Sequence, residues 1–212
     1  MRNYSLLDQV LINVDEGMRS LFAAPMASDR DYPAEKQQEA AMSQSERRHA
    51  ASLMRVNHSG EISAQALYQG QAATAQLKDV RDKMNQAALE EKDHLAWCAQ
   101  RLEELESQPS SLNFVWYLGS FMIGALAGAV GDRWSLGFVV ETERQVVEHL
   151  TEHLQRLPQQ DEKSRAIVMQ MRDDEDHHAT IALQAGGAKL PWLVQTLMRA
   201  NAKVMTSTTY YF

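Results

Sequence analysis

Three Glu-x-x-His pairs in this 212-residue sequence carry residue types that bind metal ions, and one of them, Glu46 with His49, has no partner set elsewhere in the chain. The stretch EEKDH contains Glu91 and His94, and the stretch DDEDHH contains Glu175 and His178 at the same spacing. Residues three apart are neighbours on one face of an α-helix, so each pair presents a carboxylate beside an imidazole. Because a single pair of this kind is more often solvated than bound to metal, the interpretation depends on matching partners elsewhere in the chain.

Two single glutamates supply such partners. Glu61 shares a predicted helix face with small or apolar residues and Tyr68, and Glu143 shares a face with valines and Leu150. A carboxylate in a core-facing stripe is costly unless it is protonated or meets a cation. The order of one lone Glu followed by one Glu-x-x-His pair therefore occurs twice along the chain.

Two helical hairpins would bring these groups to the same height. The midpoint between Glu61 and the first pair lies near residue 77, in LKDV, and the midpoint between Glu143 and the second pair lies near residue 160, in LPQQD. One Glu from each first helix and one Glu-x-x-His pair from each second helix form the ferritin-like di-iron or di-manganese pattern. Carboxylates and imidazoles without thiolates favour iron or manganese over structural zinc. The predicted ligands are Glu61, Glu91, His94, Glu143, Glu175 and His178.

Neighbouring residues leave the register open. Asp174 with His177, and Glu90 with Asp93, are shifted alternatives, although the apolar stripes favour the pair of Glu175 and His178. The three extra carboxylates either accept hydrogen bonds from ligand imidazoles or are solvated, and we favour the solvated interpretation.

Other side chains that could take part in chemistry are not assigned as metal ligands. We expect histidines outside the ligand set at the surface or next to the ligands, namely His58, His149 and His153. Cys98 is expected to be a core residue. Tyr68 either hydrogen-bonds near the metals or is a core tyrosine whose hydroxyl lies at the rim.

Helix-forming residues dominate the chain, and only five prolines interrupt them, so an all-α protein is expected. A capping box at Ser43–Glu46 opens the helix that carries Glu61 and continues to about Gln76. Residues 24–38 are expected to form an exposed loop. The other helices are predicted at residues 5–23, 79–106, 132–157, 159–185 and from about 191 onward, with a stop at Gly186–Gly187.

Composition narrows the function classes. A formal charge of −7 without a long basic run argues against a nucleic-acid partner. The single cysteine excludes an intrachain disulfide and fits a reducing compartment. The first residues have neither the apolar run of a signal peptide nor the composition of a transit peptide, so we expect a mature bacterial N-terminus. We expect one domain over residues 1–212.

Four stretches, RVNHSGE, EEKDH, VVETERQVVEH and DDEDHHATIALQAGG, resemble the demethoxyubiquinone hydroxylases, the di-iron monooxygenases of ubiquinone biosynthesis. The resemblance covers most of the chain from about residue 50 onward. It implies that the six residues above bind two iron ions. It also implies O2-dependent hydroxylation of the ring of a polyprenyl-methyl-methoxy-benzoquinol, the penultimate step towards ubiquinone. His149 matches a family histidine near the metals, whereas Leu150 stands where the family often has tyrosine, which argues against an electron relay there.

The resemblance also suggests partners. No NAD-binding fingerprint is present, so electrons would come from the quinol, from directly used NADH or from a partner protein. We expect the chain to form a homo-oligomer or to associate with other proteins of ubiquinone biosynthesis. The rival interpretations are a ferritin-like or rubrerythrin-like protein that handles iron or reduces peroxide, and a metal-free helical interaction module.

Residues 112–131 form an uncharged stretch in the position of the crossover between the second and third bundle helices. Its length reaches the threshold for a spanning helix, but four glycines and two polar residues argue against a true span. We expect a platform on the cytoplasmic side of the cell membrane, formed with amphipathic helices at both ends. Their stripes are Leu6, Val10, Val14, Met18 and Leu21 or Phe22, and Trp192, Leu193, Leu197, Ala200 and Val204. The alternatives are a buried crossover helix or an oligomer interface that uses Gly124 and Gly128.

Overall fold

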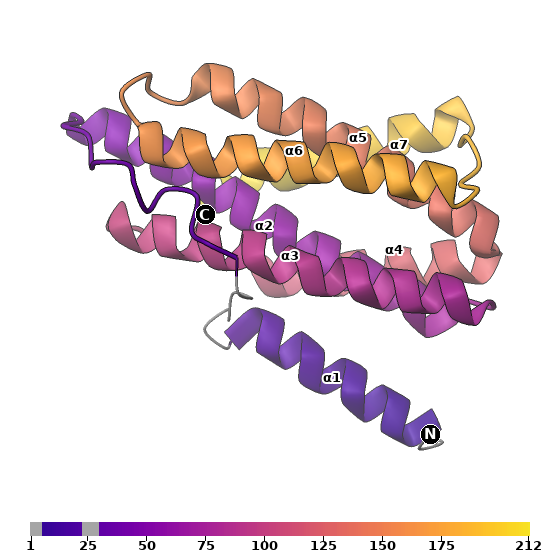
Figure 1. The fold of residues 1–212 in the computed structure, drawn as a ribbon. Helices are drawn as coiled ribbons and strands as arrows, with labels where there is room; N and C mark the ends of the chain where they lie inside the picture. The colour runs from indigo at the N-terminus through magenta and orange to yellow at the C-terminus, as the bar shows by residue number, and fades with distance from the viewer. Residues whose placement is uncertain (1–5, 23–29) are drawn as a thin grey trace.

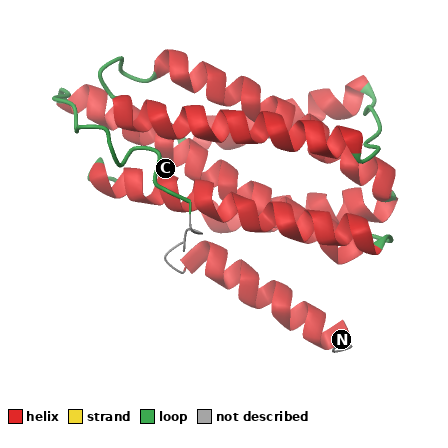
Figure 2. Ribbon diagram, viewed as in Figure 1, coloured by secondary structure: helices red, strands yellow, loops and turns green. Residues whose placement is uncertain are grey.

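The computed structural model describes residues 6–22 and 30–212, and within them the side chains of residues 6, 7, 9, 10, 13, 14, 22 and 85 are not described. This part of the chain contains helices and loops but no strand (Figure 2). The expected all-α class is confirmed. Its helices are α1 (Leu6–Phe22), α2 (Gln44–Thr74), α3 (Lys78–Glu104), α4 (Asn113–Val130), α5 (Asp132–Arg156), α6 (Glu162–Gln184) and α7 (Trp192–Thr209).

Four helices form two antiparallel hairpins, α2 with α3 and α5 with α6 (Figure 1). The predicted capping box is present: Ser43 caps α2, and the side chain of Glu46 accepts a hydrogen bond from the Ser43 backbone N–H. Both turns lie where the spacing placed them, at residues 75–77 and 157–161. Asp161 caps the start of α6 by accepting a hydrogen bond from the Ser164 N–H at 3.1 Å. Each turn therefore lies about midway along the chain between the lone glutamate before it and the Glu-x-x-His pair after it.

Helix α2 is the central element of the bundle. It packs against α3 and α4, and α1, α5 and α7 also contact it. Gln71 donates to the Ser135 carbonyl at 2.9 Å, which ties the C-terminal end of α2 to the start of α5. Being covered on several sides explains why α2 is buried almost continuously from Leu53 to Ala72. Glu61 therefore lies in the interior.

Helix α4 is the predicted crossover, and it lies along α2. Glycines allow the close approach, because a Cβ added at Gly124 would lie 2.1 Å from the carbonyl oxygen of Leu67 and one at Gly70 would lie 2.2 Å from that of Phe121. At the start of the helix, Ser59 donates to Asn113 at 2.6 Å. The close packing that glycines permit is thus used within the chain, between α4 and α2.

The opposite face of α4 is apolar and exposed, so the alternative of a buried crossover helix is wrong. Its outward side chains recur every four residues and are 50% to 70% exposed: Phe114, Leu118, Met122, Leu126 and Val130. By length and composition, α4 is the one helix in the described residues that is apolar enough to cross a membrane.

Among the described side chains, the expected stripe faces outward on α7 and only in part on α1. On α7, the five predicted stripe residues are all exposed. On α1, Met18 is 54% exposed, whereas Leu21 packs near Tyr117. The side chains of Leu6, Val10, Val14 and Phe22 lie outside what the structure describes.

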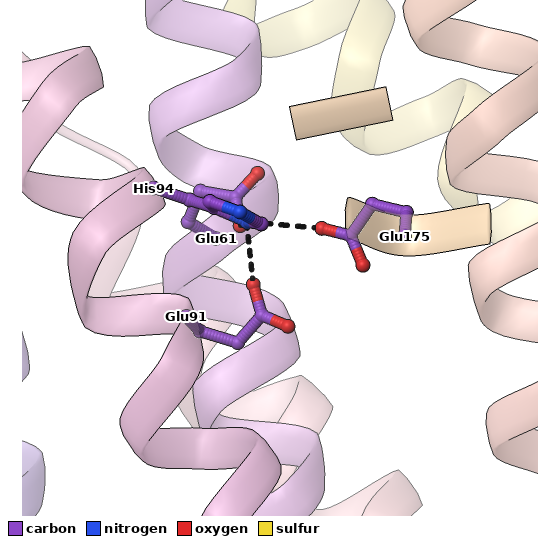
Figure 3. A group of neighbouring side chains, drawn as sticks. All are labelled: Glu61, Glu91, His94 and Glu175. Carbon is purple, nitrogen blue, oxygen red and sulfur yellow. Dashed lines mark hydrogen bonds and ion pairs between the residues drawn. The ribbon is translucent and has the colours of Figure 1, made fainter. Parts of the chain in front are cut away.

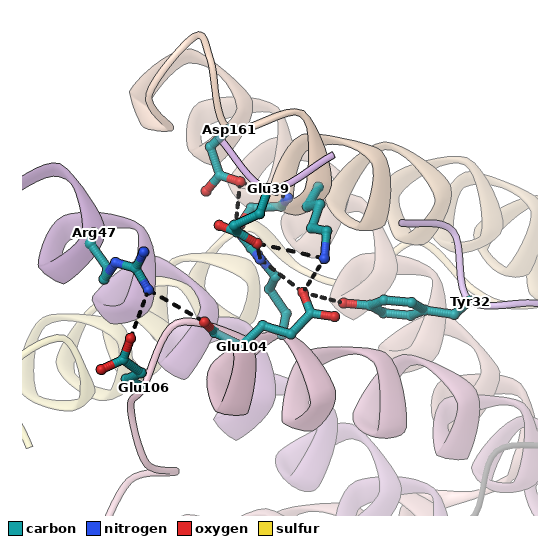
Figure 4. Close-up of polar contacts among 9 residues, drawn as sticks. Tyr32, Glu39, Arg47, Glu104, Glu106 and Asp161 are labelled. Atoms are coloured by element: carbon teal, nitrogen blue, oxygen red, sulfur yellow. Dashed lines mark hydrogen bonds and ion pairs between the residues drawn. The ribbon is translucent and has the colours of Figure 1, made fainter. Parts of the chain in front are cut away.

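The predicted loop before α2 is described over residues 30–38, where most residues are exposed as expected but the middle of the segment packs inward; residues 23–29 lie outside the described chain. Ala34 is fully buried, and Tyr32 packs against the core. The segment crosses the bundle between α6 and α3 (Figure 1). At residue 39 it joins a network of ion pairs that includes Glu104 and Asp161 (Figure 4). The network surrounds Arg101, whose side chain is fully buried. Arg101 contacts Glu39 at 2.7 Å, and Glu104 and Asp161 each at 2.8 Å. A buried guanidinium needs such partners.

Candidate metal centre

The six predicted ligands come from the four bundle helices and lie together near the middle of the bundle. Glu61 lies on α2 and Glu143 on α5, while the two Glu-x-x-His pairs lie on α3 and α6. Their side chains form two overlapping groups whose ligand atoms all lie within 4.8 Å of one another. The first group is Glu61, Glu91, His94 and Glu175, and the second is Glu91, Glu143, Glu175 and His178. Glu91 and Glu175 belong to both groups. Two neighbouring metal sites with carboxylates in common would need such an arrangement.

The imidazoles point into this cluster through the same atom (Figure 3 shows the first group). Nδ1 of His94 lies 3.1 Å from Glu175, 3.2 Å from Glu91 and 3.5 Å from Glu61. Nδ1 of His178 lies 3.2 Å from Glu175 and 3.7 Å from Glu91. Both rings therefore have Nδ1 available for a metal and Nε2 for a partner outside the cluster.

Burial shifts the pKa values of several side chains in the cluster. It raises the pKa of Glu61 and of Glu143 well above the usual range. Burial also acts to raise the pKa of Glu175, but hydrogen bonds from His178 and His94 outweigh it and hold that pKa below its ordinary value. Burial opposes charge on His178, yet its bond to Glu175 raises the pKa of the imidazole to about 9. The protein by itself thus balances its carboxylates with protons, which a bound cation would displace.

Two buried oxygen atoms test whether a metal fits. Glu91 Oε1 and Glu143 Oε1 have no hydrogen-bond partner among the described residues. Leaving a buried carboxylate oxygen unpaired is costly, and a divalent cation would satisfy both atoms. Four carboxylates also match the charge of two divalent ions. The donor set of oxygen and imidazole nitrogen fits iron or manganese.

Carboxylates outside the cluster hold the imidazoles, so the solvated interpretation of Asp174 is wrong. Nε2 of His94 donates to Asp174 at 2.9 Å, and Nε2 of His178 lies 2.9 Å from Glu90. Asp93 is also buried, at 3% exposure, rather than solvated. Partners of this kind fix the tautomer and the ring orientation of a ligand histidine. His177 is exposed, and it belongs to neither group of ligand atoms.

A cavity of about 1050 Å³ opens beside the cluster. It is lined by residues of α2, α4, α5, α6 and α7, and Glu61, Glu143 and Glu175 form part of its wall. Apolar side chains from α4 and α7, including Ile123 and Leu197, line its sides. Ligand sites are usually cavities of this size, mainly apolar with a few polar groups that fix orientation.

Sequence reasoning missed the polar residues of this cavity. Asn57, Trp116 and Thr142 line it, and each has a buried polar atom without a hydrogen-bond partner in the described part of the chain. No sequence signal marks them, because they come from α2, α4 and α5 and meet only through the packing of these helices.

The other side chains that could take part in chemistry are mostly buried. The surface interpretation of His58 and His153 is wrong, since they are 5% and 1% exposed. Burial lowers the pKa of His58 to about 4, and neither histidine belongs to the two groups of ligand atoms. Cys98 is a core residue, as predicted. Tyr68 is fully buried and its hydroxyl lacks a described partner, so the expectation of a hydroxyl at the rim is wrong.

Comparisons with known proteins agree with this geometry. The family described as ubiquinone biosynthesis protein COQ7 matches residues 31–209. Proteins named 3-demethoxyubiquinol 3-hydroxylase are similar over nearly the whole chain. The one from Nitrosococcus oceani is 54% identical, covering 99% of this chain and 98% of its own. Those from Acinetobacter baylyi and Legionella pneumophila are 55% and 51% identical, and each comparison covers all of both chains. The match spans every helix that carries a candidate ligand, and the chain belongs to the COQ7 family of ubiquinone biosynthesis proteins.

Proposed function

We propose that the protein is a 3-demethoxyubiquinol 3-hydroxylase that uses a di-iron centre and dioxygen. The observation that carries this proposal is the juxtaposition of six buried metal-binding side chains with a largely apolar cavity. The related enzymes carry the name of this activity. The ring C–H of the substrate becomes C–OH, the second oxygen atom leaves as water, and two electrons come from the quinol, from NADH or from a partner protein.

The six residues would hold the iron ions in two overlapping sets. Glu61 and His94 would help to hold one ion and Glu143 and His178 the other, with Glu91 and Glu175 belonging to both groups. Two bound ferrous ions would supply the electrons that activate dioxygen, a reaction for which amino-acid side chains have no chemistry.

The chain's own residues prepare the site for that reaction. Asp174 and Glu90 accept the Nε2 protons of the two imidazoles and so leave each Nδ1 free for iron. The closely packed core around Met171 and Cys98 excludes water from the side of the cluster away from the cavity. In the cavity, Thr142 and Asn57 would bind the oxygen atoms of the quinol ring. Their unpaired polar atoms would favour one orientation of that ring beside the carboxylates.

The polyprenyl tail would leave the site between α4 and α7. Both helices line the cavity with one face and expose apolar side chains on another. On α7 the exposed residues include Trp192, at 75%, and Leu193, at 54%. Exposed apolar surface next to a ligand site marks an interaction surface, and lipid is the medium in which a long isoprenoid chain resides. The protein would therefore lie on the cytoplasmic side of the cell membrane as a peripheral protein.

A peripheral position fits the packing of α4 better than a transmembrane one. Close contacts at Gly124 and Gly128 join α4 to α2 over much of its length. Crossing the bilayer would carry α2 and its buried carboxylate into the lipid, which would leave charged and polar groups without water. Lying flat exposes only the apolar stripe to the membrane.

An iron-storing or peroxide-reducing protein of the same fold is the main rival function. Such a protein needs the metal ligands but has no use for a cavity of this volume beside apolar helices.

Quinone analysis of bacterial cells tests the proposal. Cells that lack the gene should accumulate a demethoxy precursor of ubiquinone, and the wild-type gene should restore ubiquinone. A Glu143→Ala variant should fail to restore it and should contain less iron, whereas Glu103→Ala, which removes an exposed carboxylate on α3, should behave as wild type. Normal ubiquinone in cells without the gene would refute the proposed function. Wild-type iron content in the Glu143 variant would refute the ligand set.

A further inference from the structure

The segment that connects α1 to α2 bridges the two helices that carry the Glu-x-x-His pairs. Tyr32 donates to Glu104 of α3 at 3.4 Å, and Glu39 accepts from Arg101 of the same helix at 2.7 Å. Glu39 also lies 3.6 Å from Lys163 of α6 (Figure 4 shows the network). Together with the fully buried Ala34, these contacts dock residues 30–42 over the line where α3 and α6 meet. This line lies on the outer side of the metal cluster, away from the cavity.

Arg30 lies at the start of the docked segment and contacts two side chains that surround His94. Its Nη2 atom donates to Asp174 at 2.6 Å, and Asp174 accepts the Nε2 proton of His94 at 2.9 Å. The same guanidinium lies over the ring of Trp97 at 4.8 Å, and that ring lies 5.4 Å from the His94 imidazole. A planar guanidinium is suited to this double contact, because it pairs with a carboxylate and stacks on an aromatic face at once.

The other half of the cluster has a simpler environment. Nε2 of His178 lies 2.9 Å from Glu90, whose side chain is 42% exposed. The carboxylate beside His94 is only 19% exposed and is paired with a cation. The two candidate metal positions therefore differ in how firmly their histidines are held.

We propose that Arg30 is a positioning residue for the His94 half of the metal centre. It holds Asp174 and Trp97 against the imidazole, so that Nδ1 of His94 stays directed at Glu61, Glu91 and Glu175. The inference deepens the proposed function and rests on it, since it assumes that the cluster binds iron. It assigns the segment before α2 a role in metal binding at one of the two positions.

Replacing Arg30 should change the affinity of the cluster for a cation in two ways, and the effects of lost charge and of lost positioning have opposite signs. Removing a positive charge near four carboxylates makes the cluster more negative, and this alone would strengthen the binding of a cation. Loss of positioning would weaken it, because groups that orient a ligand histidine typically contribute 10- to 100-fold to metal affinity. Arg30 contacts Asp174 rather than the histidine itself. We therefore expect a smaller loss of iron affinity, about 3- to 10-fold, confined to one of two iron-binding steps.

The experiment measures anaerobic binding of Fe²⁺ to the purified full-length protein by competition with a chelator. Arg30→Gln is compared with Arg172→Gln, which removes the same charge from an arginine that contacts Asp173 on α6. Circular dichroism and thermal unfolding check that each variant is folded. Arg30→Gln should weaken one binding step, Arg30→Lys should recover part of the loss, and the Arg172 variant should bind as wild type.

Histidine variants locate the effect. In a His178→Ala background, Arg30→Gln should still weaken the remaining iron site, whereas in a His94→Ala background it should have no further effect. Unchanged or stronger iron binding by Arg30→Gln would overturn the proposal, as would an equal loss in both backgrounds. If the wild-type protein binds no iron, the proposed function itself fails. The two failures are therefore distinguishable.

Discussion

The exposed stripe of α4 gives a prediction for membrane binding that can be worked out from the structure. Leu118 and Leu126 lie two turns apart on this stripe, and they are 50% and 68% exposed. Replacing both with serine removes apolar area that would otherwise leave water when the helix settles on a bilayer. The glycine-lined face that packs on α2 is untouched by these changes, so the fold should be preserved.

The magnitude follows from the exposed fractions. Full burial of a leucine side chain is worth about 1.5–3 kcal/mol. Scaled by the exposure of each residue, the pair should contribute about 2–3.5 kcal/mol to membrane binding. Since about 1.4 kcal/mol corresponds to a tenfold change in affinity, the double variant should bind vesicles roughly 30- to 300-fold more weakly.

Co-sedimentation with vesicles of bacterial phospholipids measures this loss. The matched control is Ile181→Ser with Leu183→Ser on α6, where the two residues are 44% and 49% exposed on another helix. The control should bind vesicles as the wild type does. Equal binding by the α4 variant and the wild type would refute the assignment of α4 to the membrane, and an equal loss in both double variants would show that the effect is not specific to this face.

Two further predictions concern stability. Gly124→Ala places a methyl group 2.1 Å from the carbonyl oxygen of Leu67, so it should destabilise the fold by about 1–3 kcal/mol and lower the Tm. Gly119→Ala on the same helix meets no atom within 4 Å and should leave the Tm unchanged or raise it, and equal melting of both variants would contradict the described packing. A hydrogen bond from Arg101 holds the pKa of Glu39 below its ordinary value of 4.5, so this pairing stabilises the fold above about pH 4.5 and is lost as pH falls through the lowered pKa. Glu39→Gln should therefore destabilise the protein at pH 7, with a difference from wild type that shrinks in acid; a pH-independent difference in urea unfolding would count against the pairing.

Periodicity was sufficient to predict the helices and the meeting of the six candidate ligands. Glu91 and His94 lie on an apolar stripe of α3, and the turn at residues 75–77 brings them level with Glu61. Such relations depend on helical spacing and turn position, both of which are local properties of the sequence.

The surroundings of the cluster could not be predicted in this way. Asp174 lies at the flank of α6, where the sequence suggests solvent, yet the neighbouring helix α3 places His94 against it. Arg30 lies in a loop without periodicity, and its contacts depend on how that loop docks across α3 and α6. The exposed Leu197 on α7 shows a related limit, since an apolar stripe does not reveal whether its partner is protein or lipid.

The most direct test of the central claim is a single turnover by the purified protein. The protein would be loaded anaerobically with two ferrous ions, given a demethoxyubiquinol with a prenyl tail and a chemical reductant, and then exposed to dioxygen labelled with ¹⁸O. The account predicts a ring-hydroxylated product that carries one ¹⁸O atom from the wild-type protein and none from Glu143→Ala. Iron-loaded wild-type protein that consumes dioxygen without labelling the quinol ring would contradict it.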